Sequence, residues 1–68
     1  MSATMQMMLG YCLHVAKQND EAEKTVLAAH GRLLKALGPE HGNTKKAREI
    51  MRMIYRALNR PTEVEKWN

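Results

Sequence analysis

Residues 5–37 read MQMMLGYCLHVAKQNDEAEKTVLAAHGRLLKAL, and the spacing of their hydrophobic side chains decides the fold. Apolar residues return at alternating steps of three and four, a pattern that only Asn19 interrupts: Met5, Met8, Cys12, Val15, Ala22, Val26, Ala29, Leu33 and Ala36. A repeat of about 3.5 residues is typical of helices that pack along other helices. The stretch therefore predicts one long helix, over about residues 4–37.

The composition indicates an all-α fold. Hydrophobic residues make up 44% of the chain, which is ordinary for a globular domain. Ala, Leu and Met dominate this fraction and are strong helix formers, while Phe is absent. No stretch alternates apolar and polar residues for long enough to predict a strand. We therefore expect one all-α domain over residues 1–68.

A turn and a shorter second helix follow. Gly38 and Pro39 end the first helix, because glycine tolerates the left-handed conformation and proline cannot continue the hydrogen-bond ladder. The turn spans residues 38–43, Asn43 or Thr44 caps a helix over about 44–59, and residues 60–68 form a short tail. The pattern predicts an antiparallel two-helix hairpin between two apolar faces: Ala22, Val26, Ala29, Leu33 and Leu37 of the first helix, and Ala47, Ile50, Met51, Ile54 and Leu58 of the second.

The Asn19-Asp20 pair is the one place where the long helix could break. Asp20 could cap a new helix, which would give three short helices instead of a hairpin. We favour the continuous helix, because Asn19 fits a core position at which a buried Asn fixes register, and Asp20 can pair with Lys24 one turn later. Gly10 and Gly31 cost about 1 kcal/mol each relative to Ala, and they either permit close helix approach or mark bends.

The N-terminal half of the first helix has no partner within this hairpin. A helix over 5–37 would span about 50 Å, whereas one over 44–58 would span about 22 Å. A chain of 68 residues gains stability from a second subunit, and its single cysteine excludes an intrachain disulfide. Exposed apolar surface of this kind marks an interface. We predict a homodimer with a helical-bundle interface formed by Met5, Met8, Leu9, Cys12, Leu13, Val15 and Asn19.

Basic residues recur along the second helix. Residues 45–60 hold six cations and one anion, a net charge of +5, which exceeds the +4 of the whole chain. The planar guanidinium fork suits carboxylates and phosphates. The ridge is therefore either a solvated face, a surface for a larger acidic protein, or, less favoured, a surface for nucleic acid. The candidate partner-binding residues are Lys45, Arg48, Arg52, Arg56 and Arg60.

No catalytic or metal-binding pattern is present. His14 and His30 would lie about 160° and 24 Å apart on one helix, His41 lies in the turn, and no Cys/His spacing matches a zinc site. There is no nucleophile–base pair, and the acidic cluster is interpreted as a solvated face: Asp20, Glu21 and Glu23. We therefore expect no enzyme activity and no cofactor.

Two further expectations concern the localisation of the protein and the role of Trp67. The N-terminus is a poor signal peptide, and no window approaches the roughly 18 apolar residues of a membrane span, so we expect a soluble cytoplasmic protein with no membrane partner. Trp67 either folds back onto the helices or anchors a partner.

These features predict a non-enzymatic protein–protein interaction module. The alternative is a small DNA-binding regulator of helix-turn-helix type with a basic last helix. Against that alternative, the 38–43 turn is longer than usual and the first helix is too long and straight.

The layout resembles the small early proteins of temperate bacteriophages, which are basic helical hairpins that dimerise and disable host factors. One such type is an anti-activator that sequesters a quorum-sensing transcription factor. The resemblance covers the chain length, the long-then-short helix order across Met5–Leu37 and Thr44–Leu58, and the lack of catalytic residues. It implies a small dimeric inhibitor of a host regulatory protein such as a transcription factor, and it assigns no role to any residue.

Overall fold

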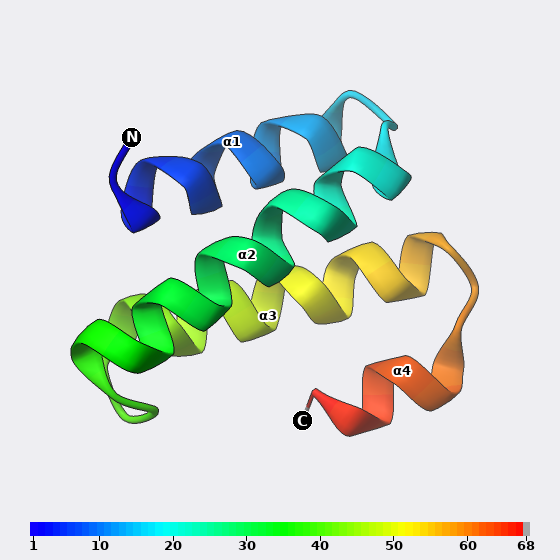
Figure 1. Cartoon of the computed structure of the whole chain (residues 1–68). Helices are drawn as coiled ribbons and strands as arrows, with labels where there is room; N and C mark the ends of the chain where they lie inside the picture. Colours follow the sequence, from blue (N-terminus) through cyan, green and yellow to red (C-terminus); the bar gives the residue numbers. More distant parts are fainter. Residues whose placement is uncertain (68) are drawn as a thin grey trace.

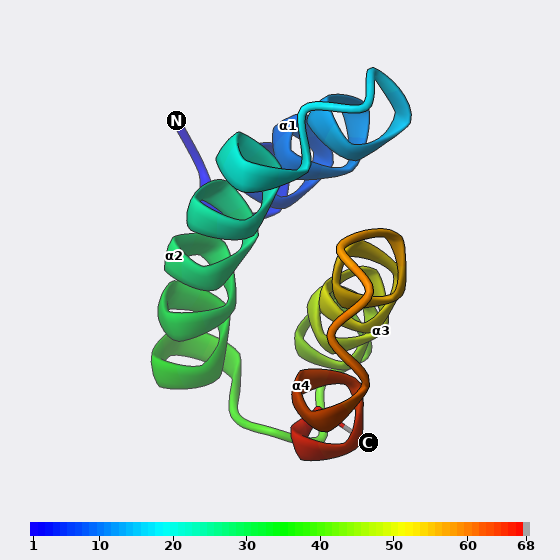
Figure 2. The ribbon, with the colours of Figure 1, turned by 90° about the vertical axis from the view of Figure 1, so that its right-hand side faces the viewer.

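The computed structural model describes residues 1–67, which form four α-helices and no strand: α1 (Ala3–Val15), α2 (Asn19–Leu37), α3 (Gly42–Ala57) and α4 (Pro61–Lys66) (Figure 1). The all-α class is confirmed, although the two expected helices are four. Helices α1 and α3 both run antiparallel to α2, which contacts both of them (Figures 1 and 2). The short α4 folds back beside α3. No helix in residues 1–67 is long and apolar enough to cross a membrane.

The prediction of one continuous helix over residues 4–37 is wrong. The first helix ends at Val15 and the next begins at Asn19, so the break falls just before the Asn19-Asp20 pair. Gln18, and not Asp20, stands at the N-cap of α2. Residues 16–18 reverse the chain and lay α1 back along α2. The N-terminal apolar half, expected to lack a partner in its own chain, therefore packs against α2.

A Schellman motif makes this break. Lys17 takes a left-handed conformation with φ of 65°. Its N–H donates to the His14 carbonyl at 3.0 Å, and the Gln18 N–H donates to the Leu13 carbonyl at 2.9 Å. These two bonds satisfy the last carbonyls of α1 and redirect the backbone. A lysine carries no sequence signal for this role, which glycine or asparagine usually fills.

The turn between α2 and α3 is shorter than expected. As predicted, α2 ends at Leu37 and is followed by Gly38 with φ of 85°. The connection then covers only residues 38–41. His41, rather than Asn43 or Thr44, caps α3, because its Nδ1 accepts the Asn43 N–H at 3.1 Å.

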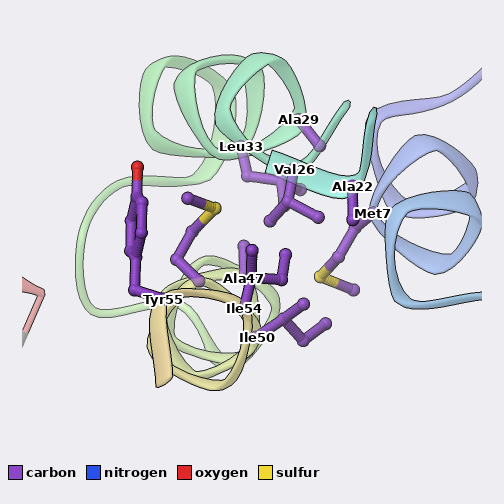
Figure 3. Close-up of a cluster of buried hydrophobic side chains, with 10 residues drawn as sticks. Met7, Ala22, Val26, Ala29, Leu33, Ala47, Ile50, Ile54 and Tyr55 are labelled. Carbon is purple, nitrogen blue, oxygen red and sulfur yellow. The ribbon is translucent and has the colours of Figure 1, made fainter. Parts of the chain in front are cut away.

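The core lies between α2 and α3, with one large side chain from α1. As predicted, α2 buries Ala22, Val26, Ala29 and Leu33, while α3 buries Ala47, Ile50, Met51 and Ile54 (Figure 3). Tyr55 and Met7 complete this cluster. The ends of the predicted faces differ, because Leu37 is exposed and Leu58 is only partly buried.

Gly10 sets how closely α1 approaches α2. It is buried, and a Cβ at this position would overlap the Val26 Cγ2 atom and lie 3.3 Å from the Val26 backbone nitrogen. Glycine alone leaves room for this contact. Of the two roles considered for Gly10, close helix approach is the one observed.

Candidate functional site

The most unusual feature of the molecule is α1, which is mainly apolar and carries no Asp, Glu, Lys or Arg on any side. No Asp, Glu, Lys or Arg occurs between Met1 and Lys17. A helix on the surface of a globular protein normally places charged residues on its outward side, whereas a helix that is hydrophobic all round is normally buried. Packing against α2 covers only one side of α1, so the other side is apolar and faces outward.

The inner side of α1 is not the one that the heptad spacing predicted. Met7 and Gly10 are buried, and Ala3 and Leu13 pack against the core. The predicted interface residue Leu13 is therefore largely occupied within the chain.

Asn19, also predicted at the interface, opens α2 instead of sitting within a long helix. Its Oδ1 accepts a hydrogen bond from His14 Nδ1 at 2.7 Å. The side chain that was expected to fix register between two chains thus bridges the α1–α2 break.

The other five predicted interface residues lie together on the outward side. Met5 and Val15 are each 62% exposed, Met8 is 50% exposed and Leu9 is 43% exposed. Cys12 is also exposed. At 100° per residue they cover, together with Tyr11, an arc of about 160° around the helix. We call this surface the outer face of α1: Met5, Met8, Leu9, Tyr11, Cys12 and Val15.

A groove lies beside this face, between α1 and α3, and has a volume of about 350 Å³. In Figure 2, α1 and α3 lie apart from one another on the same side of α2. Two residues on each helix line the apolar part of the groove, and two charged residues of α3 complete it: Met8, Tyr11, Ile50 and Met53, with Lys46 and Glu49. Because Met8 and Tyr11 belong to both, the α1–α3 groove and the outer face of α1 form one continuous surface.

The basic residues of the predicted ridge are largely used inside the chain. Arg52 donates to the Trp67 carbonyl at 2.7 Å, Arg60 pairs with Glu23 at 3.6 Å, and Lys45 pairs with Glu40 at 3.3 Å. Arg56 is exposed. Arg52 therefore contacts the end of α4, while Lys45, Arg56 and Arg60 remain exposed to solvent.

Glu23 is a structural residue that the sequence did not reveal. It accepts a hydrogen bond from the Tyr55 hydroxyl at 2.6 Å, and its side chain is only 22% exposed. Burial, and then this bond and the charge of Glu23, raise the pKa of Tyr55 far above its usual range. The expectation that Glu23 belongs to a solvated face is wrong, and no local pattern signals a pair separated by 32 residues.

Trp67 folds back onto the helices, which is one of the two placements that the sequence allowed. Its ring meets the His30 ring edge-on, with centroids 4.8 Å apart. Burial, and then the charge of Arg48, lower the pKa of His30, whose Nε2 is buried without a hydrogen-bond partner in residues 1–67. The tail therefore packs, through Trp67, against an imidazole whose charged form is disfavoured.

Within residues 1–67, no three His, Cys, Asp or Glu side chains gather where they could hold a metal ion. Comparisons of the chain with protein-family models, with curated proteins and with solved structures found no match. Function is therefore inferred from the surfaces of α1 and α3.

Proposed function

We propose that this protein is a non-enzymatic protein–protein interaction module, a small homodimer that binds a host regulatory protein such as a transcription factor and acts as its inhibitor or anti-activator. The outer face of α1 carries the proposal. Water disfavours apolar surface by about 25 cal/mol per Å², and α1 has no charged side chain whose desolvation would oppose its burial. A helix of this kind is suited to contact with another protein.

The positions of the perturbed groups support a binding role over catalysis. His30 and Tyr55 have shifted pKa values, which often mark active sites. Here, however, His30 packs on Trp67 and Tyr55 is bonded to Glu23. Neither of them lines the α1–α3 groove.

The exposed part of the basic ridge suits an acidic surface of the target. Arg56 is solvent-exposed, and the Lys45–Glu40 pair is held between side chains that are 60% and 88% exposed. An exposed ion pair contributes little, so an acidic partner can replace Glu40 at small cost. In this proposal α1 mediates dimerisation and the α3 cations contact the target.

DNA binding is the second candidate, and the four-residue α2–α3 connection favours it more than the sequence did. That length matches the turn of a helix-turn-helix unit, and the straight 4–37 helix that opposed it does not exist. Against it, α2 and α3 run antiparallel, whereas helix-turn-helix pairs cross at about 90–120°. Protein binding remains the better supported function.

Capture from source-cell lysate tests the proposal. The bait is the tagged protein, compared with a Lys45→Glu/Arg56→Glu variant and with a Lys24→Glu/Lys35→Glu control on α2. We expect a regulatory protein to be retained by the wild type and the control, and to bind the α3 variant about tenfold more weakly. Purified target activity should fall in proportion to added wild-type protein.

The same variants separate the two candidates. Each is titrated against random duplex DNA across a range of salt concentrations. Tight binding that falls steeply with salt and disappears in the α3 variant, without any captured regulator, would overturn the proposal in favour of DNA.

A further inference from the structure

We propose that the α1–α3 groove is the seat of α1 from a second copy of this chain. The two copies are related by a two-fold axis, so that each gives one helix and receives one. This inference rests on the homodimer in the proposed function. It adds that residues of α3, which line one side of the groove, also belong to the dimer interface.

The surface that would enter the groove is continuous with the groove itself. Met8 and Tyr11 line the groove and also belong to the outer face of α1. In a two-fold dimer the same patch is used on both subunits, so it must be self-complementary. A patch that contains both a helix and a groove beside it meets this condition. The groove lies between two helices that run in the same direction.

A stable dimer needs a large buried area. A specific interface buries about 800 Å² per partner, and α1 is a helix of only 13 residues. Seating α1 in the groove brings it against α1 and α3 together, adding Ile50, Met53 and the aliphatic stem of Lys46. The outer face of α1 thereby gains contacts that an α1–α1 pair alone does not provide.

The polarity of α1 also suits the groove. A helix that enters an apolar groove must bring no unpaired charge or polar group with it. Three of the four polar side chains in the body of α1 are bonded within their own chain: Gln6 accepts from Arg32 at 2.9 Å, Thr4 accepts from Asn43 at 3.4 Å, and His14 donates to Asn19 at 2.7 Å. The fourth is Tyr11, which is 38% exposed. The charged groove residues, Lys46 and Glu49, are exposed. This charge-free α1 is thus well suited to the groove, and every copy of the chain carries one.

Sedimentation equilibrium of three single variants tests the seat. Leu9→Glu places a charge on the outer face of α1, and Met53→Glu places one on the α3 wall. Leu34→Glu is the matched control, because Leu34 on α2 is 42% exposed and Leu9 is 43% exposed. We expect the wild type and Leu34→Glu to be dimers at tens of micromolar, and the other two to dissociate with dissociation constants at least about 100-fold higher.

The outcomes separate this inference from the proposed homodimer. If Leu9→Glu dissociates while Met53→Glu stays dimeric, the dimer uses α1 alone and the groove proposal is overturned, but the homodimer stands. A wild type that is monomeric at these concentrations overturns both. Target capture in either case reports on the proposed function independently.

Crosslinking provides a second test that introduces no charge. Wild-type protein, whose only thiol is Cys12, is mixed with a tagged Cys12→Ala/Met53→Cys chain and treated with a short bis-maleimide. A crosslinked heterodimer of the two masses is expected, whereas a tagged Cys12→Ala/Leu34→Cys chain should give little. Equal yields from the two tagged chains, with their helicity preserved by circular dichroism, would refute the seat.

Discussion

At the scale of single residues, one carboxylate joins three parts of the fold. Glu23 on α2 bonds Tyr55 near the end of α3 and pairs with Arg60 just before α4. The Arg60 pair is partly solvent-exposed at 3.6 Å, so it contributes little. The Tyr55 bond is short, and its acceptor is charged, which makes it the stronger contact.

We expect Tyr55→Phe to lower the free energy of unfolding by about 1–2 kcal/mol, because it leaves Glu23 without its hydroxyl donor. The raised pKa of Tyr55 adds a pH dependence. The unfolded chain loses this proton near the ordinary tyrosine pKa of 10.0, whereas the folded chain keeps it, so stability is complete below that pH and falls above it. Tyr55→Phe should remove that alkaline loss.

Urea unfolding at neutral and alkaline pH measures both effects of this substitution. Tyr11→Phe is the control, since Tyr11 lies on the outer face of α1 and is 38% exposed. Identical alkaline profiles for the wild type and Tyr55→Phe would show that the Glu23 contact has no energetic role.

At the scale of elements, the fold depends on how α1 meets α2. Alanine normally stabilises a helix by about 1 kcal/mol relative to glycine. At Gly10 this gain is outweighed, because the added methyl group overlaps Val26. We expect Gly10→Ala to destabilise the protein by about 1–3 kcal/mol. Gly31→Ala is the matched control on α2, where nothing lies within 4 Å, and it should stabilise. Thermal unfolding of both variants tests this prediction. If both variants are stabilised, the close contact between Gly10 and Val26 is contradicted.

The break after α1 has an equally direct test. Lys17 holds a left-handed conformation that costs a residue with a side chain about 1 kcal/mol, and glycine avoids this cost. We therefore expect Lys17→Gly to raise the free energy of unfolding by about 1 kcal/mol. Lys24→Gly, within α2, should lower it by a similar amount. If both variants lose stability equally in urea unfolding, residues 4–37 form one helix after all.

The sequence predicted α2 and α3 well and α1 poorly, for a physical reason. In α2 and α3, apolar and polar residues alternate by face, so only one register fits, and the predicted core residues from Ala22 to Ile54 are buried. In α1, the spacing Met5-Met8-Cys12 and the spacing Met7-Gly10-Leu13 are both apolar. The 3.5-residue repeat of apolar residues therefore continues across residues 16–18 in the sequence, although the helix does not.

At the scale of the whole molecule, the apolar character of the outer face of α1 could be predicted from the sequence, and the internal contacts could not. Five of the seven predicted interface residues lie exposed on this face, together with Tyr11, and their part in an interface stays a prediction. The sequence showed that the arginines recur along the second helix, but not that some of them bond within the chain. Arg52 and Arg60 act within the chain through α4, whose docking depends on residues far apart in the sequence.

Docking of α4 should depend on pH through His30. The pKa of His30 is lowered in the folded chain, so the unfolded state takes up its proton first as the pH falls. The contact is complete above the ordinary histidine pKa of 6.5 and is lost below it. Trp67, the only tryptophan, reports this directly: its fluorescence emission should move to longer wavelength on acidification. His30→Phe should abolish the shift, and a shift of equal size in that variant would exclude His30 as its cause.

The single thiol of Cys12 gives the molecule a built-in reporter. A sulfhydryl reacts with an alkylating reagent only while the reagent can reach it, and this one lies on the outer face of α1. Its modification rate should consequently fall as the protein is concentrated and the second copy covers this face. Association can thus be followed by mass spectrometry on unaltered protein, without a dye, a tag or a substitution.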